Sequence, residues 1–454
     1  MKVVVVGGGF AGLAAAIDLQ EHRHDVLLLE RRGVLGGRAT SYRDAISGDD
    51  VDNGTHLMIG AYRATLDLLR RAGAEDLLLA QDDLRIDYVD DRGFSSLLCP
   101  PIAAPFHLLA GLLRLRVPWR VRVDALRFGL AVRFGRPPEG ITLAEYFRRT
   151  GQSSETRRLL WDPLALAILN EVPARAAASL FHAVYREAFL ASHRASRLVF
   201  LRRGYGALHE RLGRYLEARG GAIRRRALVE RIEVEDGRVV GVSYSQRAEG
   251  REEIQRGTVA TPGRVHADAV VVAAPWHAVG ALLPEDWRSR PPFEGLPRLG
   301  ASPIVSIEVW LDRVVTDRTM VGLRDSEIEW VFDKGRLHGR DGPPQQLAFI
   351  VSAAYRSAPR TNVELVAAAE AALRRYFPAM AEAQVTRSLV LREAMATFVS
   401  DPEVEQLRPG NTTPIPGLFL AGDWTDTGLP ATIEGAVRSG LAAARLAQAA
   451  HRPS

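Results

Sequence analysis

Residues 2–30 read KVVVVGGGFAGLAAAIDLQEHRHDVLLLE, and this run says more about the fold than any other part of the chain. The β-branched residues at 3–6 favour a fully buried strand. A glycine-rich turn follows, and residues 13–17 are strong helix formers. A second apolar run at 26–29 predicts another strand, which ends at Glu30. The order predicts a β-α-β unit of a parallel sheet.

The spacing Gly7-x-Gly9-x-x-Gly12, placed between a strand and a helix, is typical of dinucleotide binding. Gly7 permits the tight turn, Gly9 lets the backbone approach a pyrophosphate, and Gly12 lets the helix pack against the sheet. The helix N-terminus offers unpaired N–H groups to the anion. Glu30 suits a ribose 2′-hydroxyl and would repel a 2′-phosphate. The predicted dinucleotide contacts are Gly7, Gly9, Phe10, Ala11, Gly12, Glu30 and Arg31.

A second glycine pair lies close behind this unit, in GGRATS at residues 36–41. A flavin dinucleotide reaches past the first turn, so a second point of close backbone approach beside a cation favours FAD over NAD. The alternative is an ordinary loop that carries a surface arginine. We predict FAD as the cofactor, with Gly36, Gly37 and Arg38 among its contacts.

Length and composition describe a globular protein with room for a large core. The 454 residues predict two or three domains, and 47% apolar with 25% charged residues is an ordinary balance. The net charge is +5, but lysine occurs only at positions 2 and 334, and the arginines are spread along most of the chain. This distribution does not indicate nucleic-acid binding.

Cys99 is the only cysteine, so neither an intrachain disulfide nor a cysteine-based metal site is expected, and we predict no metal. Met1 and Lys2 run straight into the first strand without a signal-peptide pattern, which favours a reducing cytoplasmic compartment. The longest uncharged span, residues 94–113, contains three prolines, which would break a membrane-spanning helix.

An arginine-rich amphipathic segment follows, because residues 114–136 carry seven arginines and a single acid, Asp124. One side of its helical wheel carries Trp119, Val123, Leu126, Leu130 and Phe134. Apolar residues flanked by arginines are typical of a helix lying in a membrane interface. A strand over 128–134 and a core-packed helix with a solvated arginine edge are the alternatives. We predict a membrane-surface segment within residues 98–136.

The remaining patterns alternate between helix and strand. Asp236-Gly237 predicts a tight hairpin turn, and Thr361-x-x-Glu364 is a capping box. Residues 246–264 are polar and predict an irregular, exposed extension. Helices are predicted near 62–72, 161–170, 205–219, 364–377 and 433–450, and strands near 228–234, 239–244, 269–275, 304–311, 347–352 and 417–421.

The first and last units together resemble the FAD-dependent amine oxidase and phytoene desaturase superfamily over essentially the whole length. Besides the N-terminal glycine motifs, the matching segments are LVERI at 228–232, AAP at 273–275 and LAGD at 420–423. The resemblance implies an α/β, Rossmann-like FAD-binding domain that is discontinuous in sequence, with an inserted α+β substrate domain. The implied segments are 1–75, 196–290 and 386–454 for the first domain, and 76–195 and 291–385 for the second.

The same resemblance implies further cofactor contacts. Asp423 would hold the ribityl or pyrophosphate region, and Val229 would meet the adenine through its backbone. The helix that opens near Thr432 and Ile433 would aim its N–H groups at the O2 edge of the flavin and stabilise negative charge there. The other implied contacts are Asn53, Gly54, Thr55, His56, Ala274 and Gly422.

Narrower motifs resemble the hydroxysqualene dehydroxylase family of bacterial hopanoid biosynthesis. They are DNGTH at 52–56, WDPLALAILN at 161–170 and GDWTDTGLPATIEGA at 422–436. Thr55 departs from the pattern, which is expected to have glutamine at this position. The resemblance implies reductive removal of an allylic hydroxyl group from hydroxysqualene, which gives squalene and water.

Hydroxide is a poor leaving group, so this reaction needs an acid or a dry pocket that stabilises a carbocation-like state. The candidate acids are His56, Asp426 and Glu434. Each has a structural alternative: His56 would orient the cofactor turn, Asp426 would cap a helix, and Glu434 would occupy the first turn of a helix. The electron donor that reduces the flavin is unidentified, because no separate nicotinamide domain is visible.

Three alternatives remain beside this hypothesis. The first is a carotenoid or phytoene-type desaturase, and the second is an amine oxidase, for which Lys334 in a predicted loop is a poor stand-in for a lysine near the flavin. The third is a non-enzymatic isoprenoid binder on the same fold. We expect a long-chain isoprenoid substrate and a peripheral location on the inner face of the cytoplasmic membrane.

Overall fold

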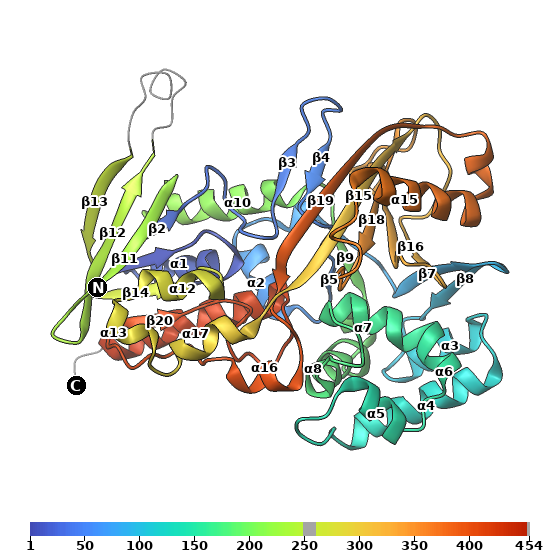
Figure 1. Ribbon diagram of the computed structural model, residues 1–454, viewed down its shortest axis with the longest axis horizontal. Helices are drawn as coiled ribbons and strands as arrows, with labels where there is room; N and C mark the ends of the chain where they lie inside the picture. The colour runs from blue at the N-terminus through green and yellow to red at the C-terminus, as the bar shows by residue number, and fades with distance from the viewer. Residues whose placement is uncertain (248–259, 452–454) are drawn as a thin grey trace.

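A parallel five-stranded sheet forms one end of the elongated molecule, at which the N-terminus also lies (Figure 1). The computed structural model describes residues 1–247 and 260–451. In spatial order, the strands are β10 (Ala222–Arg225), β2 (Asp25–Glu30), β1 (Lys2–Val6), β14 (Ala269–Val272) and β20 (Leu418–Leu420). Since these strands come from four distant parts of the chain, the sheet is discontinuous in sequence, as predicted.

Both faces of this sheet are covered, which explains the unbroken valine run of β1. Val3 and Val5 pack against α1 (Phe10–Glu21), α17 (Ile433–His451), α10 (Tyr205–Glu217) and α2 (Arg63–Arg71). Val4 and Val6 face a three-stranded antiparallel sheet and α12 (Trp276–Leu282). The strands of that second sheet are β11 (Ala227–Glu235), β12 (Arg238–Gln246) and β13 (Thr261–His266).

A seven-stranded mixed sheet dominates the other end of the molecule (Figure 1). Its order is β19 (Val385–Thr397), β15 (Ser302–Leu311), β18 (Gln345–Val351), β17 (Trp330–Asp333), β16 (Met320–Leu323), β7 (Arg85–Asp90) and β8 (Gly93–Leu98). The odd-numbered residues of β15, such as Val305 and Ile307, pack with α15 (Asn362–Tyr376). β19 begins at Val385, one residue before the predicted domain boundary at 386, and pairs with β15. The predicted domain limits stay predictions.

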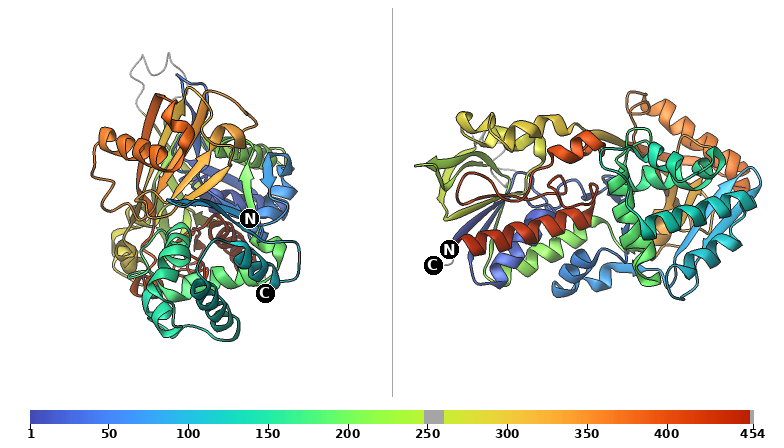
Figure 2. Two further views of the ribbon diagram at one scale, coloured as in Figure 1. Left: turned by 90° about the vertical axis from the view of Figure 1, so that its right-hand side faces the viewer. Right: turned by 90° about the horizontal axis from the view of Figure 1, so that it is seen from below.

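The opposite face of the seven-stranded sheet packs against a layer of helices (Figure 2). Phe128 of α4 lies at the centre of an aromatic cluster, with Trp161 and Tyr185 at ring-centroid distances of 4.9 and 5.4 Å. The apolar residues of this layer form one continuous core with those of the sheet. The helices are α3 (Phe106–Arg114), α4 (Trp119–Phe134), α5 (Leu143–Arg149), α6 (Ser154–Thr156), α7 (Asp162–Leu169), α8 (Ala178–Val184) and α9 (His193–Ser196).

The predicted amphipathic segment is a helix, α4, so the strand alternative is wrong. Its core side is formed by other residues, among them Val121, Ala125 and Phe128. The predicted apolar stripe faces outward, and Trp119 and Phe134 are 66% and 80% exposed. The core-packed alternative is therefore wrong for this stripe. Among the described residues, the structure contains no helix that combines the length and apolar character needed to cross a membrane.

Most of the other predicted elements are confirmed. The hairpin β11–β12 turns at Asp236 and Gly237, which both have a positive φ, and the Thr361 capping box is present. The predicted irregular extension is wrong at 261–264, which belong to β13, and its residues 248–259 lie outside the described residues. The short elements are β3 (Ser41–Arg43), β4 (Asp50–Asp52), β5 (Met58–Ile59), β6 (Leu78–Ala80), β9 (Leu198–Leu201), α13 (Glu285–Arg288), α14 (Lys334–Leu337) and α16 (Pro402–Leu407).

Candidate functional site

The turn from β1 into α1 has the close packing that its glycines predict. Gly7 has a φ of 106°, which L side chains rarely adopt. A Cβ on Gly12 would lie 1.9 Å from the carbonyl oxygen of Gly7, so this position must be glycine. Gly9 precedes α1 without any side-chain cap, and the first turn of α1 holds no acidic residue. The N-terminal N–H groups of α1, which include those of Phe10 and Ala11, are thus left for an anion.

A second glycine segment lies directly against this turn. The N–H of Gly36 donates to the carbonyl oxygen of Gly8 at 2.8 Å. A Cβ on Gly9 would find no atom nearer than 3.8 Å, and that atom is the Cα of Gly37. The two glycine segments therefore lie in direct contact, and together they present backbone that a pyrophosphate can approach closely.

Glu30 lies at the carboxyl end of β2, beside the same turn. Its carboxylate accepts hydrogen bonds from the N–H groups of Gly8 and Arg32, both at 2.7 Å. These contacts hold the buried carboxylate at the position where a ribose would lie. The neighbouring Arg31 is exposed, and its predicted cofactor contact stays a prediction.

The two ends of the chain meet at Arg38 and Asp423. The guanidinium of Arg38 forms an ion pair with the Asp423 carboxylate and also lies 5.6 Å from the ring of Trp276. The amide of Asn53 donates to the carbonyl oxygen of Arg38 at 3.3 Å and to Glu393 at 2.8 Å. The predicted proximity of Arg38 and Asp423 is confirmed.

The loop at residues 53–56 follows β4 and turns at Gly54, whose φ is 84°. The Nδ1–H of His56 donates to the Gly54 carbonyl oxygen at 2.8 Å, and its ring packs edge-to-face on Tyr205 at 5.3 Å. Burial lowers the pKa of His56, so the imidazole is neutral at neutral pH. The buried hydroxyl of Thr55 has no hydrogen-bond partner within residues 1–247 and 260–451. The loop thus offers a polar atom to a bound group.

The C-terminal unit contributes the residues around Asp423. The Thr432 side chain caps α17 by accepting from the N–H of Gly435 at 3.0 Å. The predicted contact of Thr432 and Ile433 with the flavin stays a prediction. A Cβ on Gly422 would meet the Trp424 indole at 2.2 Å, and that indole donates to the carbonyl oxygen of Ala274 at 3.1 Å. These contacts fix the turn that presents Asp423.

Val229 lies in β11 at a β-bulge, because the pairing register with β12 shifts between Val229 and Arg231. The bulge disrupts the regular backbone pairing at the residue predicted to meet the adenine. The contact itself stays a prediction.

The structure gives Glu434 and Asp426 surroundings that differ from those of a catalytic acid. The buried Glu434 carboxylate accepts from the N–H groups of Ala64 and Thr65 at 3.1 and 2.9 Å, and it pairs with Arg438 at 2.8 Å. It therefore caps the N-terminus of α2, which supports the structural alternative. Asp426 is exposed.

Sequence reasoning missed a buried polar cluster next to the loop. Lys334, expected in a loop, is buried at the start of α14 and forms an ion pair with Asp52. Gln346 joins Glu308 to β4, because its amide donates to Glu308 at 3.1 Å and to the Asp50 carbonyl oxygen at 3.2 Å. Burial raises the pKa of Glu308 to about 8. The available signal was the alternation of β15, in which Ser306 and Glu308 interrupt an apolar strand.

This cluster continues into an apolar surface on the same face of the seven-stranded sheet. Trp330, Phe332, Ala348 and Ile350 point toward the helical layer and join its core. The loop at 53–56 lies at the junction, because a Cβ on Gly54 would be 3.7 Å from the Ser306 hydroxyl. The arrangement places polar groups at one end of a buried apolar region.

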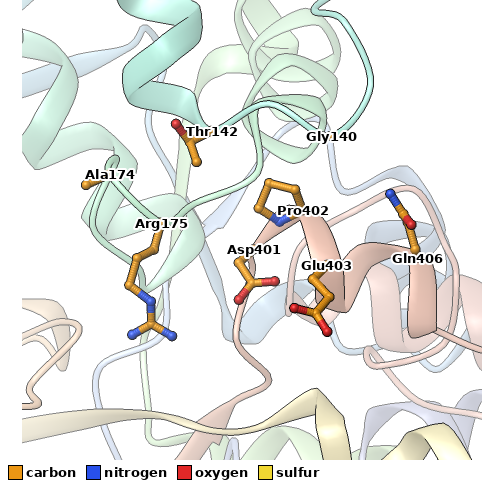
Figure 3. Close-up of a pocket in the computed structure, with 8 residues that line it drawn as sticks. All are labelled: Gly140, Thr142, Ala174, Arg175, Asp401, Pro402, Glu403 and Gln406. Atoms are coloured by element: carbon orange, nitrogen blue, oxygen red, sulfur yellow. The ribbon is translucent and has the colours of Figure 1, made fainter.

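An open surface cavity of about 490 Å³ lies elsewhere, beside α16 (Figure 3). Arg175, Asp401 and Glu403 are among its lining residues, and Figure 3 shows their side chains around the opening. No predicted site residue lines it, so it is separate from the loop at 53–56.

A family model described as flavin containing amine oxidoreductase matches residues 10–447. The chain is 30% identical to hydroxysqualene dehydroxylase of Rhodopseudomonas palustris, over 99% of both chains. It is also 27% identical to a 15-cis-phytoene desaturase of Synechococcus elongatus, over 97% of this chain and 94% of that one. A probable zeta-carotene desaturase of the same organism is likewise 27% identical, over 98% of both chains.

Solved structures share the fold. An oxidoreductase from Methanosarcina mazei superposes with a TM-score of 0.75 at 18% identity, over 97% of this chain and 99% of that one. Putrescine oxidase bound to putrescine superposes with a TM-score of 0.67 at 16% identity, over 99% of both chains. The predicted Rossmann-like α/β fold of the amine oxidase type is confirmed, and so is FAD as the cofactor. The glycine cradle, Glu30, Arg38 and Asp423 are the residues that would hold it.

Proposed function

The chain belongs to the flavin containing amine oxidoreductase family, and on that premise we propose that it removes the allylic hydroxyl group of hydroxysqualene and releases squalene. It is an FAD-dependent oxidoreductase, and its curated relatives include enzymes named for isoprenoid substrates. The observation that carries the proposal is the 30% identity to hydroxysqualene dehydroxylase over 99% of both chains. The step would belong to hopanoid biosynthesis.

The reaction breaks one C–O bond, forms one C–H bond, and consumes a hydride equivalent and a proton. When bound, FAD supplies the two-electron chemistry, and an electron donor still to be identified would restore its reduced form. The apolar face formed by Trp330, Phe332 and Ile350 would bind the hydrocarbon chain and exclude water. The substrate hydroxyl would then lie at the polar end, beside Ser306 and the loop at 53–56.

His56 is the one member of the three candidate acids whose surroundings suit contact with substrate. Its Nδ1–H is engaged by Gly54, so Nε2 carries no proton and can accept a hydrogen bond from the substrate hydroxyl. Because burial lowers the pKa of His56, the imidazole would orient the hydroxyl rather than protonate it.

A carotenoid-type desaturase is the second candidate function, because the phytoene and zeta-carotene desaturases are only slightly less similar at 27% identity. The two reactions run in opposite redox directions. Anaerobic incubation of the reduced holoenzyme with hydroxysqualene is expected to produce squalene, detected by gas chromatography. If hydroxysqualene is unchanged and phytoene instead reduces the oxidised holoenzyme, the desaturase function replaces the one proposed.

A membrane-surface location is part of this proposal, because hydroxysqualene and squalene dissolve in the bilayer. The outward apolar side of α3 and α4 supports it, with Phe106, Leu113, Trp119, Leu130 and Phe134 each at least half exposed. Within residues 1–247 and 260–451, the arginines at 114–136 form no ion pair with an acid. The only acid there, Asp124, is buried and accepts hydrogen bonds from Ser153 and Thr156. An exposed arginine contributes about 1 kcal/mol beside an anionic lipid surface.

Flotation with phosphatidylglycerol vesicles tests this location. The double variant Leu130→Glu and Phe134→Glu is expected to lose most vesicle binding, because carboxylates would replace the inserted side chains. Val363→Glu is the matched control, since Val363 is 79% exposed on the distant helix α15. Equal flotation of the two variants would contradict docking through α4.

A further inference from the structure

The polar cluster below the loop at 53–56 holds one cation and two acids. The ammonium of Lys334 pairs with Asp52, and both side chains are at most 4% exposed. Glu308 is 1% exposed and receives one hydrogen bond from Gln346, which is a neutral group. Two carboxylates facing a single ammonium would leave one buried negative charge without compensation, which is costly. Retention of one proton on Glu308 removes that cost.

The other charged groups near Glu308 also favour its protonated form. Asp49 adds a further negative charge, although its own carboxylate is engaged by Arg340 and by the indole of Trp310 at 2.7 Å. Tyr42 is neutral, and Glu308 contributes to raising its pKa. His338 is kept neutral, because burial lowers its pKa to about 4. Burial and the charges of Asp52 and Asp49 raise the pKa of Glu308 to about 8, against the opposing effect of Lys334.

Glu308 also lies on a path to the loop. Ser306 and Glu308 are two residues apart on β15, so they share one sheet face at a separation of about 7 Å between their Cα atoms. The Ser306 hydroxyl is buried, lies close to Gly54, and has no hydrogen-bond partner among the residues that the structure describes. A hydroxyl group can accept one proton and donate another. Because no described residue holds the Ser306 hydroxyl, it is free to turn between Glu308 on the same sheet face and a group bound at the loop.

We propose that Glu308 is the proton source for the departing hydroxyl group, and that the Ser306 hydroxyl carries the proton to it. This inference rests on the proposed dehydroxylation. As the C–O bond breaks and a hydride equivalent forms the new C–H bond, Glu308 would give its proton to the Ser306 hydroxyl, Ser306 would give its own proton to the departing group, and the hydroxyl would leave as water. Glu308 becomes a carboxylate, which Lys334 stabilises from across the cluster, and a proton from solvent restores it. Glu308 does not contact the substrate in this proposal, since its proton reaches the departing group through Ser306.

The test uses full-length, FAD-loaded enzyme. Infrared difference spectra of the wild type, recorded below and above the Glu308 pKa of about 8, are expected to contain the C=O band of a neutral buried carboxyl group. That band should be absent in Glu308→Gln. In the reduced enzyme mixed with hydroxysqualene, Glu308→Gln is expected to slow squalene formation about a hundredfold, and Glu308→Asp to restore part of the rate. The wild-type rate should also fall as the pH rises through about 8, whereas the Glu308→Gln rate should not.

Glu329→Gln is the matched control. Burial raises the pKa of Glu329 to about 8 as well, but its carboxylate accepts from the N–H of Ser352 and lies outside the cluster. This variant should lose a different band and keep the wild-type rate. If Glu308→Gln kept every infrared band of the wild type, or kept the wild-type rate of squalene formation, the proposed role of Glu308 would be contradicted. The proposed dehydroxylation would not be affected. A wild type that leaves hydroxysqualene unchanged would overturn the proposed function and the inference with it.

Discussion

Glu434 and Asp426 carry the same functional group in very different surroundings. Glu434 is buried and holds the N-terminus of α2, whereas Asp426 is exposed. Glu434→Gln is expected to lower the free energy of unfolding by about 1–3 kcal/mol, because it weakens contacts with two N–H groups and leaves Arg438 without its buried partner. Denaturant titration measures this loss.

Asp426→Asn serves as the comparison and should change the stability by at most about 0.5 kcal/mol, as exposed substitutions usually do. Both variants should convert hydroxysqualene at the wild-type rate once folded and loaded with FAD. A Glu434→Gln variant that is fully stable but inactive would indicate that Glu434 is a proton donor rather than a structural residue.

Glu308 also makes a prediction about pH. Its pKa is raised from 4.5 to about 8 in the folded protein, so the folded state binds more protons than the unfolded state between these values. The stabilisation is fully present below pH 4.5 and is lost as the pH rises through about 8. The stability of the wild type relative to Glu308→Gln should therefore fall over this interval, as measured by denaturant titration at each pH. A difference that does not depend on pH would contradict the raised pKa.

Residue types alone did not reveal the buried polar cluster of Lys334, Asp52 and Glu308. Lys334 stands before a glycine and was expected in a loop, but it is buried because Asp52, 282 positions away in the sequence, pairs with it. The alternation of Ser306 and Glu308 was readable in the sequence, yet only the register of β15 with β18 shows that both lie on the face toward the loop. Pairings over such sequence distances are set by tertiary packing.

At the scale of elements, the β1–α1 turn is the most sharply specified part of the fold. Gly12→Ala would place a Cβ against the Gly7 carbonyl oxygen, and the chain cannot yield without moving β1 or α1. We expect a loss of about 1–3 kcal/mol in the free energy of unfolding together with loss of bound FAD, measured by denaturant titration and by flavin absorbance.

Gly280→Ala is the matched control, because Gly280 also lies in a helix, α12, and a Cβ there would contact no described atom within 4 Å. This change should stabilise the protein by about 0.4–1 kcal/mol and keep FAD bound. Similar behaviour of the two alanine variants would show that close packing at Gly12 is unimportant.

Elements with strong local signals were predictable and the others were not. The β1–α1–β2 unit, the Thr361 capping box and the Asp236 turn all depend on neighbouring residues, and all three are present. The apolar stripe of α4 was predicted from its 3.6-residue period and is exposed. β13 was missed because Pro262 and Gly263 do not favour a strand, and it forms through pairing with β12.

At the scale of the whole molecule, the Arg38 and Asp423 motifs meet because the N-terminal and C-terminal units share one sheet. Arg38 and Asp423 are 385 residues apart in sequence and form an ion pair. The sequence predicted this meeting from the order of its motifs. It could not predict how the seven-stranded sheet packs against the helical layer, because that depends on contacts between residues far apart in the sequence, such as those around Phe128.

Arg38→Met tests whether FAD binds where Arg38 and Asp423 meet. The Arg38 guanidinium pairs with Asp423 and donates to the Ala396 carbonyl oxygen at 2.8 Å, so its loss should weaken FAD binding by about tenfold or more, equivalent to about 1.5–3 kcal/mol for a charged hydrogen bond. Reconstitution of the apoprotein with FAD, followed by flavin fluorescence, gives the dissociation constant. Arg43→Met is the control, because the Arg43 side chain is 74% exposed. An unchanged dissociation constant for Arg38→Met would place the cofactor elsewhere.

The most direct test of the proposed function is a count of molecules in a single anaerobic turnover. Enzyme holding one reduced FAD is mixed with excess hydroxysqualene, and the oxidised-flavin absorbance and the squalene formed are measured in the same sample. Reductive dehydroxylation predicts one squalene for each flavin that is reoxidised. Reoxidation without squalene, or no reoxidation while phytoene bleaches the oxidised enzyme, would contradict it.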